Sequence, residues 1–477
     1  MVILMLICSL LVCSGLSAQK PMNFDEALAT MLANNKALEA AQQSVAAAEL
    51  EQRAAQGLRW PRIDLFGAYL HLQQDISVDL GGAKGAITES VESLISKGVS
   101  GGLISPDAGA FIGDILSPLI SGNWRYNLQQ RSLGSIFATL EMPIYTGGRI
   151  NIINRVASLN TDAANIELSA INSGLLVTLV ERYYGVILAK ELYNVRVEAL
   201  RSIEQHLSDA NAMYEEGMLQ RSVILYLEYK VSEAQRDKES AQHQLEIARL
   251  ALKSLLNIDY DIEPSLNLFV CNNVYNIGYY IDNAIKLNPI ICEVDIEKRL
   301  AEEGVKLARA ALLPEIVAMG AASIYNYQVS NMLPRWFVGV GLNVTLFDGL
   351  AKERRLRAAK ATAIGIDNMV ENTKSDIVLI VEKEYFNMLN EKQNIDAVER
   401  SVTFADEYYH TVYSAFIEGV MSATDVTTAQ VELSIAKVEY LNAAYNYCVS
   451  LSKLLAAAGL ASTFSDYVEN GKYIDID

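Results

Sequence analysis

The chain of 477 residues is poor in proline, and this shortage leaves long stretches free to form helices. It has nine prolines, and none lies at 144–263 or at 335–477. A proline inside a helix removes a hydrogen bond and clashes with the preceding turn. Its absence therefore permits two very long helical segments.

Histidine is scarce as well, which argues against several kinds of enzyme. The four histidines, His71, His206, His243 and His410, are scattered and form no metal-ligand spacing and no histidine–acid pair. His206 lies in a polar helical stretch, and we interpret it as a surface residue. The sequence predicts neither an enzyme nor a metal or other cofactor.

The N-terminus has the pattern of a secretory signal peptide. Residues 1–18 contain an apolar core at 2–12 followed by small residues, although no lysine or arginine precedes the core. Cys13 would suggest lipid attachment, but Val12 before it is larger than the residue usual at such sites.

Cysteine is too rare to build a disulfide framework. After removal of the signal, Cys271, Cys292 and Cys448 remain, which is an odd number. Cys271 and Cys292 either form a bridge or stay two packed thiols.

Positively charged residues are outnumbered, since the chain has 57 acidic residues and only 39 lysines and arginines. A net charge of −18 makes nucleic acid an improbable partner. No segment after the signal is an apolar run long enough for a transmembrane helix, which excludes such a helix. If the chain crosses a membrane, we expect it to do so with strands.

A long unit occurs twice in the sequence, 202 residues apart. Such a repeat over more than a hundred positions indicates a duplicated structure. One alignment without gaps pairs 142–147 with 344–349, Tyr183–Tyr184 with Tyr385–Phe386, Gly217 with Gly419, and Ile258 with Leu460.

Each copy of this unit is predicted to form a long helical hairpin. In the second copy apolar residues recur at alternating steps of three and four, which is the pattern of a coiled-coil seam. They are Ile395, Val398, Val402, Ala405, Tyr409, Val412 and Phe416. Residues 150–215, as one helix, would span roughly 100 Å. Gly217 and Gly419 are placed where a left-handed turn suits glycine, although each alone would be an ordinary turn residue.

A second register, 253 residues apart, relates the segments before the hairpins. Asn35 aligns with Asn288, and Pro61 with Pro314. A helix is predicted to begin at Asn23 and to run through to Leu58, where Pro61 stops it. The predicted organisation is a first repeat at 19–258, an inter-repeat equatorial segment at 259–279, a second repeat at 280–460 and a tail at 461–477.

The two registers differ by about 50 residues, so the first repeat carries an insertion at 75–131. Its many glycines, with Pro106 and Pro118, predict a long loop and not a separate domain.

Four strands are predicted, at 62–74, 132–145, 315–328 and 335–347. The alternation of apolar and polar residues fits lipid-facing strands of a membrane barrel and fits strands of a sandwich equally well. Trp60, Tyr325, Tyr327 and Trp336 would be interfacial girdles or ordinary core aromatics. The clearest apolar face holds Trp336, Val338, Val340, Leu342, Val344 and Leu346.

Several short motifs occur in the same order in both halves. They include Asp25–Leu28 with Asn34–Asn35, Asn288–Pro289, Ala310–Pro314, Pro143–Arg149, Leu346–Gly349 and the two hairpin tips. With these motifs the mature chain resembles the TolC-type outer-membrane efflux protein family. The resemblance implies a mainly α fold with a membrane β-barrel. It implies a homotrimer in which each chain gives four strands to one 12-stranded barrel in the outer-membrane lipid, with the helices forming a periplasmic tunnel.

The resemblance also implies roles for the hairpin tips. At the second tip, family members carry a tyrosine, an arginine and two aspartates that close the tunnel. Here Phe416, Met421, Asp425 and Thr428 occupy those positions, and only Asp425 matches. An acidic ring of Asp425 is the resulting hypothesis, and a carboxylate stabilised by the start of a helix is the alternative. The tips expected to dock a periplasmic adaptor hold Gly217, Met218, Leu219, Ser222, Gly419, Val420 and Thr424.

The function implied is an export channel of a Gram-negative-type envelope. It would act with an adaptor and an inner-membrane transporter of the RND, ABC or MFS type, for efflux or type I secretion. The alternative is a periplasmic coiled-coil scaffold without a pore. Amphipathic strands at duplicated positions argue against that scaffold.

Overall fold

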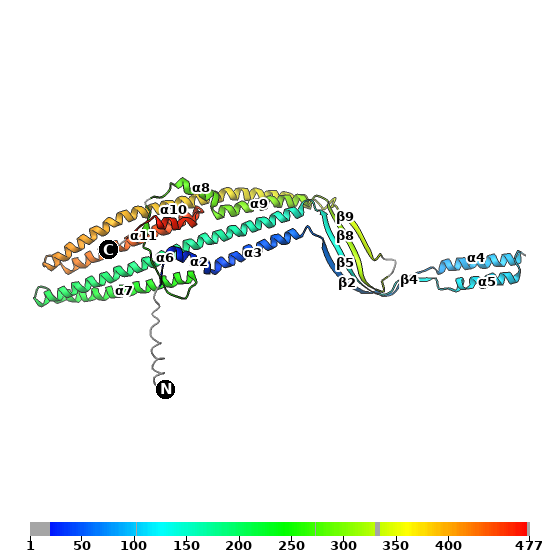
Figure 1. Cartoon of the computed structure of the whole chain (residues 1–477), viewed down its shortest axis with the longest axis horizontal. Helices are drawn as coiled ribbons and strands as arrows, with labels where there is room; N and C mark the ends of the chain where they lie inside the picture. Colours follow the sequence, from blue (N-terminus) through cyan, green and yellow to red (C-terminus); the bar gives the residue numbers. More distant parts are fainter. Residues whose placement is uncertain (1–19, 102, 272, 330–333, 475–477) are drawn as a thin grey trace, which may run out of the picture. The chain divides into compact units, whose positions relative to one another are not determined.

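The computed structural model describes residues 20–101, 103–271, 273–329 and 334–474 (Figure 1). The predicted signal peptide at 1–18 lies outside these residues. The chain divides into two units, which we call the helical unit (1–53, 155–305 and 357–477) and the sheet unit (54–154 and 306–356).

The long helices form two hairpins, as the repeat predicts. Helices α6 (Arg149–Glu215) and α10 (Ala351–Ile417) each have 67 residues, and both their ends are 202 positions apart. They are followed by α7 (Arg221–Leu256) and α11 (Ala423–Ala457). At 1.5 Å per residue α6 and α10 are each about 100 Å long.

The predicted seam of the second hairpin is the buried face of α10. Ile395, Val398, Tyr409, Val412 and Phe416 are all buried, and Val402 and Ala405 are half-buried. The step of three and four residues therefore identified the packing face of this helix.

The helix predicted from Asn23 to Leu58 is in fact two helices, so that prediction is wrong at its middle. Helix α2 (Phe24–Asn34) ends where Asn35 adopts an extended backbone, and α3 (Lys36–Gly57) begins directly after it. The second repeat has the same break at Asn288, between α8 (Ile277–Leu287) and α9 (Pro289–Ala310). The cause is asparagine, because its side-chain oxygen accepts hydrogen bonds from the next helix's first N–H groups.

The inter-repeat segment and the tail form a belt around the middle of the helical unit. Strand β1 (Lys20–Met22) pairs in parallel with β6 (Ile262–Pro264), and β7 (Phe269–Val270) pairs antiparallel with β10 (Lys472–Tyr473). A 3-10 turn (η1, Ala461–Thr463) and helix α12 (Phe464–Glu469) complete it.

The core of the helical unit lies behind this belt. An aromatic cluster in this core holds five of its largest buried side chains, Phe24, Tyr183, Tyr184, Phe269 and Phe464. The Tyr183 hydroxyl donates a hydrogen bond of 2.9 Å to the Met22 carbonyl.

The three described cysteines are free thiols, so Cys271 and Cys292 form no bridge. The Cys271 thiol donates to the Tyr467 carbonyl, and burial raises its pKa.

The sheet unit contains one antiparallel sheet of four strands in the order β2-β5-β8-β9. These are β2 (Arg62–His71), β5 (Ser132–Tyr145), β8 (Glu315–Tyr327) and β9 (Trp336–Asn343). All four predicted strands are present. Strand β9 is shorter than predicted and leaves Val344 and Leu346 outside it. Its partner β8 starts at Glu315, opposite Asn343, and the preceding Pro314 has no N–H to continue the ladder.

The insertion at 75–131 is not a loop, so that prediction is wrong. Strands β3 (Ile76–Asp79) and β4 (Arg125–Gln129) form a ribbon that carries two antiparallel helices, α4 (Gly81–Ser100) and α5 (Pro106–Ser121). Two of the residues taken as breakers, Pro106 and Gly109, serve a helix start and helix packing, while Pro118 lies inside α5. Pro106 occupies the first turn of α5, after the N-cap Ser105. A Cβ on Gly109 would lie only 2.7 Å from Cγ2 of Val99.

One described helix passes a test of length and composition for a membrane span, which the sequence had excluded. It is α6, and the rest of the chain leaves most of its apolar stretch uncovered. A single helix of this kind is weak evidence for a span. Leu179, Val180 and Tyr183 of α6 are in the core of the helical unit.

Candidate functional site

The two hairpin tips pack against each other in one cluster within the chain. We call this set of buried residues the tip cluster, and all four long helices contribute to it. Its members are Ala210, Ile224, Leu227, Tyr409, Val412, Phe416, Ala423, Val426, Ala429 and Leu433. Burial of these apolar side chains therefore holds the two tips of one chain together without a contribution from a second copy.

Both turns are built in the same way. Gly217 and Gly419 have φ angles of 79° and 78°, a left-handed conformation that suits glycine. The next residue in each turn donates to the carbonyl five positions back, at 2.8 Å from Met218 and 2.9 Å from Val420. Met218 and Val420 are 64% and 75% exposed. Ser222 and Thr424 are exposed too, whereas Leu219 packs against the tip cluster.

Asp425 forms a capping box at the start of α11. Its Oδ2 accepts hydrogen bonds from the Ser422 N–H (2.9 Å) and hydroxyl (2.7 Å), and Ser422 Oγ accepts from the Asp425 N–H. These bonds stabilise the carboxylate and lower the pKa of Asp425. Within one chain, the contacts of Asp425 are therefore those of a carboxylate at the start of a helix, which is the alternative to an acidic ring.

The other residues predicted to lie at the constriction differ in their surroundings. Thr428 is exposed and donates to the Thr424 carbonyl. Met421 is 43% exposed, and Phe416 is only 1% exposed. Phe416 therefore packs inside its own chain, while Asp425, Thr428 and Met421 remain available at the surface.

His206 is buried, so its interpretation as a surface residue is wrong. It is 2% exposed and lies on the stripe Leu200, Ile203, His206 and Ala210, with steps of three, three and four residues. That spacing was a signal in the sequence, but the polar neighbours obscured it. Burial lowers the pKa of His206 to about 4, and the nearby Asp209 opposes this shift.

His206 belongs to a polar cluster between the two hairpins. Its Nε2 lies 3.0 Å from the Tyr409 hydroxyl, and its ring lies 4.9 Å from that of Tyr413. The Tyr413 hydroxyl donates a bond of 2.6 Å to Asp209. Sequence reasoning missed this cluster because its members come from α6 and α10.

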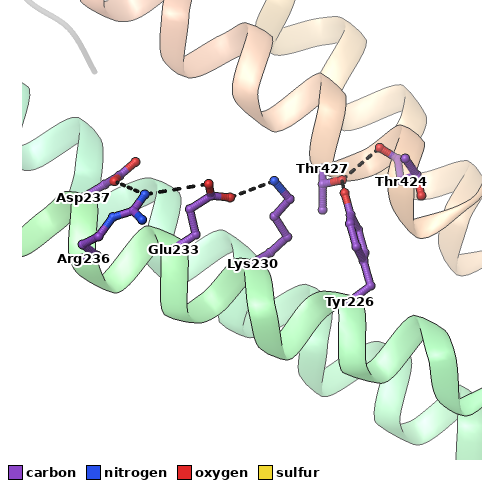
Figure 2. A network of polar contacts seen from close by, with 7 residues as sticks. All are labelled: Tyr226, Lys230, Glu233, Arg236, Asp237, Thr424 and Thr427. Carbon is purple, nitrogen blue, oxygen red and sulfur yellow. Dashed lines mark hydrogen bonds and ion pairs between the residues drawn. The ribbon is translucent and has the colours of Figure 1, made fainter.

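A second polar network joins α7 to α11 near the tips (Figure 2). The Tyr226 hydroxyl lies 3.1 Å from Oγ1 of Thr427, which donates to the Thr424 carbonyl. Further along α7, an exposed or half-buried row of Lys230, Glu233, Arg236 and Asp237 is linked by ion pairs. Pairs of this kind contribute little stability, but they hold the side chains in an ordered row.

A groove lies beside these networks, between α6, α7 and α11. Its volume is about 280 Å³, and its lining includes Arg196, Lys230, Thr427 and Gln430. Farther from the tips, the nearly buried Lys437 of α11 pairs with Glu198 of α6 at 2.8 Å. Hydrogen bonds and an ion pair thus connect the first hairpin to α11 both near the tips and farther along α11.

The sheet has one strongly apolar face. On β9 this face holds Trp336, Val338, Val340 and Leu342, which are 67–76% exposed. The paired register continues it across β8 and β5 to Ile63, Leu65 and Tyr69 of β2, which are also exposed. Val344 and Leu346, predicted for the same face, are exposed but lie after the strand.

The opposite face is more polar. It carries Arg62, Asp64, Thr139 and Glu141, and the glycines Gly339 and Gly341. Arg62 pairs with Asp64 at 2.7 Å. The alternation predicted from the sequence is therefore present on β5 and β9, whereas β8 carries apolar residues on both faces.

Comparison with known proteins agrees with this geometry. Residues 280–460 match the family model described as outer membrane efflux protein. This match covers the second repeat of the chain. The chain is 21% identical over 311 residues to outer membrane protein TolC of Vibrio cholerae, covering 63% of this chain and 70% of the relative.

Solved structures of similar fold cover nearly the whole of this chain. A membrane protein from Pseudomonas aeruginosa has a TM-score of 0.72 and 15% identity, over 93% of this chain and 91% of its own. CusC has a TM-score of 0.71 and 14% identity, over 94% and 95%. The MtrE outer membrane channel of Neisseria gonorrhoeae has a TM-score of 0.69 and 16% identity, over 92% and 89%.

The family places the chain in the outer membrane. The family description is that of outer membrane efflux proteins, and no catalytic family is indicated. Among the described residues, no group of three or more histidine, cysteine, aspartate or glutamate side chains is placed to hold a metal.

Proposed function

We propose that the protein is a passive export channel whose sheet closes into a barrel with those of other copies. The observation that carries this proposal is the four-stranded sheet with an exposed apolar face. In the described part of the chain, β2 and β9 each pair on one side only, so both outer edges are open.

Open edges decide how such a sheet enters a membrane. Each unpaired N–H or C=O group would cost several kcal/mol in lipid, so membrane strands occur in closed barrels. Four strands are too few to close by themselves, since the smallest membrane barrels have about eight. Joining β2 of one copy to β9 of the next satisfies both edges, and three copies would give the twelve strands that the family resemblance implies.

The long hairpins would continue from this barrel as a periplasmic tunnel. Their exposed tip residues, among them Met218 and Val420, supply apolar contacts for a periplasmic adaptor. The adaptor would in turn connect the channel to an inner-membrane pump of the RND, ABC or MFS type. The pump would determine the substrate, because the channel has no chemistry of its own.

A pair of lysine substitutions on β9 tests the barrel. Val340→Lys places a charge on the apolar face, where lysine costs about 2–4 kcal/mol at the middle of a membrane. Asn343→Lys, three residues later on the opposite face, is the matched control. We expect Val340→Lys to lose the oligomer that unheated electrophoresis detects in detergent-extracted outer membranes. Asn343→Lys should retain this oligomer and the single-channel current in planar bilayers.

Two results would contradict the proposal. One is equal assembly of both lysine variants, which would show that the apolar face does not meet lipid. The other is release of the wild-type protein by osmotic shock, as expected of a periplasmic scaffold without a pore.

A further inference from the structure

The inserted hairpin α4–α5 has one apolar side that its own chain leaves uncovered. The two helices pack along a seam of half-buried residues that includes Val91 and Ile95 on α4 and Leu116 and Ile120 on α5. Gly109 lets the helices approach closely. At the base, Lys84 Nζ donates to the Gly122 carbonyl at 2.9 Å.

Apolar residues flank this seam on one side. They lie one position before seam residues, and in an antiparallel helix pair such positions of both helices fall on the same side. The apolar members of this side are Ile87, Leu94, Phe111, Ile112 and Ile115, of which Phe111 precedes Ile112 and not a seam residue, with Ser90 and Lys97 as polar members. Their exposed fractions are 48%, 70%, 66%, 36% and 57%, respectively.

The opposite flank is polar and acidic. The residues one position after the seam are Glu89, Glu92 and Ser96 on α4 and Asp114 and Ser117 on α5. The hairpin is therefore amphipathic as a two-helix unit. We call the side with Leu94 and Phe111 its apolar flank.

We propose that the apolar flank packs against the same flank of other copies of this chain, so that the hairpins form one helical bundle. This inference rests on the proposed function, in which neighbouring copies join through the edges of their sheets. It adds a second interface that the sheet edges do not require.

The connections of the hairpin place it next to that first interface. The chain enters through β3, just after the edge strand β2, and leaves through β4, just before β5. The Leu72 N–H donates to Arg131 and the Arg131 N–H donates to Asp75, which keeps the two connections together. In a closed sheet of several copies, β8 and β9 would separate the bases of neighbouring hairpins, and all the hairpins would rise from the same rim.

The composition of the hairpin favours an identical partner. Helices of 20 and 16 residues need a packing partner, yet among the described side chains of α4 and α5 none is fully buried. The acidic residues Glu89, Glu92 and Asp114 lie off the apolar flank, which carries one charged residue, Lys97, in the last turn of α4. Identical flanks therefore meet without repulsion between carboxylates, and the flexible lysine stem lets its amino group reach solvent.

Cysteine cross-linking tests the bundle in the full-length protein purified from membranes. Leu94→Cys lies on the apolar flank, and Ser96→Cys is an exposed control two residues away. Both are made with Cys292→Ser, since Cys271 and Cys448 are buried. We expect oxidation to link Leu94→Cys copies in pairs on a denaturing gel, several-fold more than Ser96→Cys copies. Ile115→Cys with the control Ser117→Cys should repeat this difference on α5.

The outcomes separate this inference from the proposed function. An intact oligomer on an unheated gel without preferential cross-linking at Leu94→Cys would overturn the bundle and leave the channel. Absence of any oligomer would overturn both. Quenching of a fluorophore at Leu94→Cys by brominated lipid would show that the membrane surface covers the flank, and the bundle would be rejected.

Discussion

Nε2 of His206 lies 3.0 Å from the hydroxyl of Tyr409, and this pair joins α6 of the first hairpin to α10 of the second. His206 Nδ1 is buried and has no hydrogen-bond partner in the described part of the chain. Facing the ring are Tyr409 and Tyr413 from α10 and Asp209 from α6. This environment accommodates a neutral imidazole better than a charged one.

The contact between the hairpins should weaken in mild acid. In the folded chain the pKa of His206 is lowered to about 4, whereas the unfolded chain has the ordinary value near 6.5. Between these values the unfolded state binds more protons, so stability falls as the pH is lowered from about 6.5 to about 4. We expect a loss of about 2 kcal/mol per chain between pH 7 and pH 5, measured by thermal unfolding in detergent.

Two glutamine variants identify the histidine responsible. His206→Gln should be less stable than wild type at pH 7 and should lose most of the pH dependence. His410→Gln, at a position 68% exposed on α10, should keep it. A wild-type pH dependence in His206→Gln would assign the acid effect to other groups.

Asn35 and Asn288 perform the same task in the two repeats, but with unequal consequences. Each accepts bonds of 2.9 and 3.3 Å from the N–H groups two and three residues ahead. Asn288, only 3% exposed, also donates to the Ala457 carbonyl at 2.8 Å. We expect Asn35→Ala to cost about 1 kcal/mol, as for loss of a cap, and Asn288→Ala about 2 kcal/mol or more. Melting temperatures of the two variants provide the comparison, and equal losses would show that the bond to Ala457 contributes nothing.

Much of this fold follows from the sequence because it is periodic and duplicated. The ends of α6 and α10 lie at the predicted offset, and the four strands follow from alternation. These features depend on neighbours along the chain, which a sequence displays directly.

The errors concern features that depend on distant residues. Burial also differs between equivalent positions of the repeat, for which nothing was predicted: Tyr184 is completely buried, whereas its repeat partner Phe386 is 57% exposed, since the belt covers only one of them. His206 is buried because α10 packs on it. Gly109 lies in a helix because it lets α4 and α5 pack closely, and Pro106 lies in one because it occupies the first turn of α5. Only the assembled chain shows these neighbours.

Asp425 is the one residue at the second tip that matches the family that the chain resembles, and its charge can be tested apart from its capping role. If copies bring these carboxylates together, a divalent cation added on the periplasmic side should block single-channel current. Asp425→Asn should raise the blocking concentration about tenfold or more, because the site loses its charge. Ser422→Ala weakens the same cap but keeps the carboxylate, so it should retain the block. Equal block in wild type and Asp425→Asn would remove the acidic ring from the proposal.

Closure of the tips is predicted to rest on apolar residues at the surface of each copy. Phe416 is buried in the tip cluster, so contacts between copies fall to Val420 and Met421, which are 75% and 43% exposed. Met421→Asp would place a charge in this apolar contact, where a desolvated carboxylate is costly. We expect a several-fold rise in resting conductance in planar bilayers.

A matched substitution at the other tip separates closure from docking. Met218→Asp introduces the same charge at a residue that is 64% exposed on the first hairpin. We place Met218 on the docking surface and not at the constriction. The resting conductance of Met218→Asp should therefore equal that of wild type. A rise in both variants would indicate a general loosening of the tips. An unchanged current in Met421→Asp would show that apolar contacts between copies do not hold the tunnel closed.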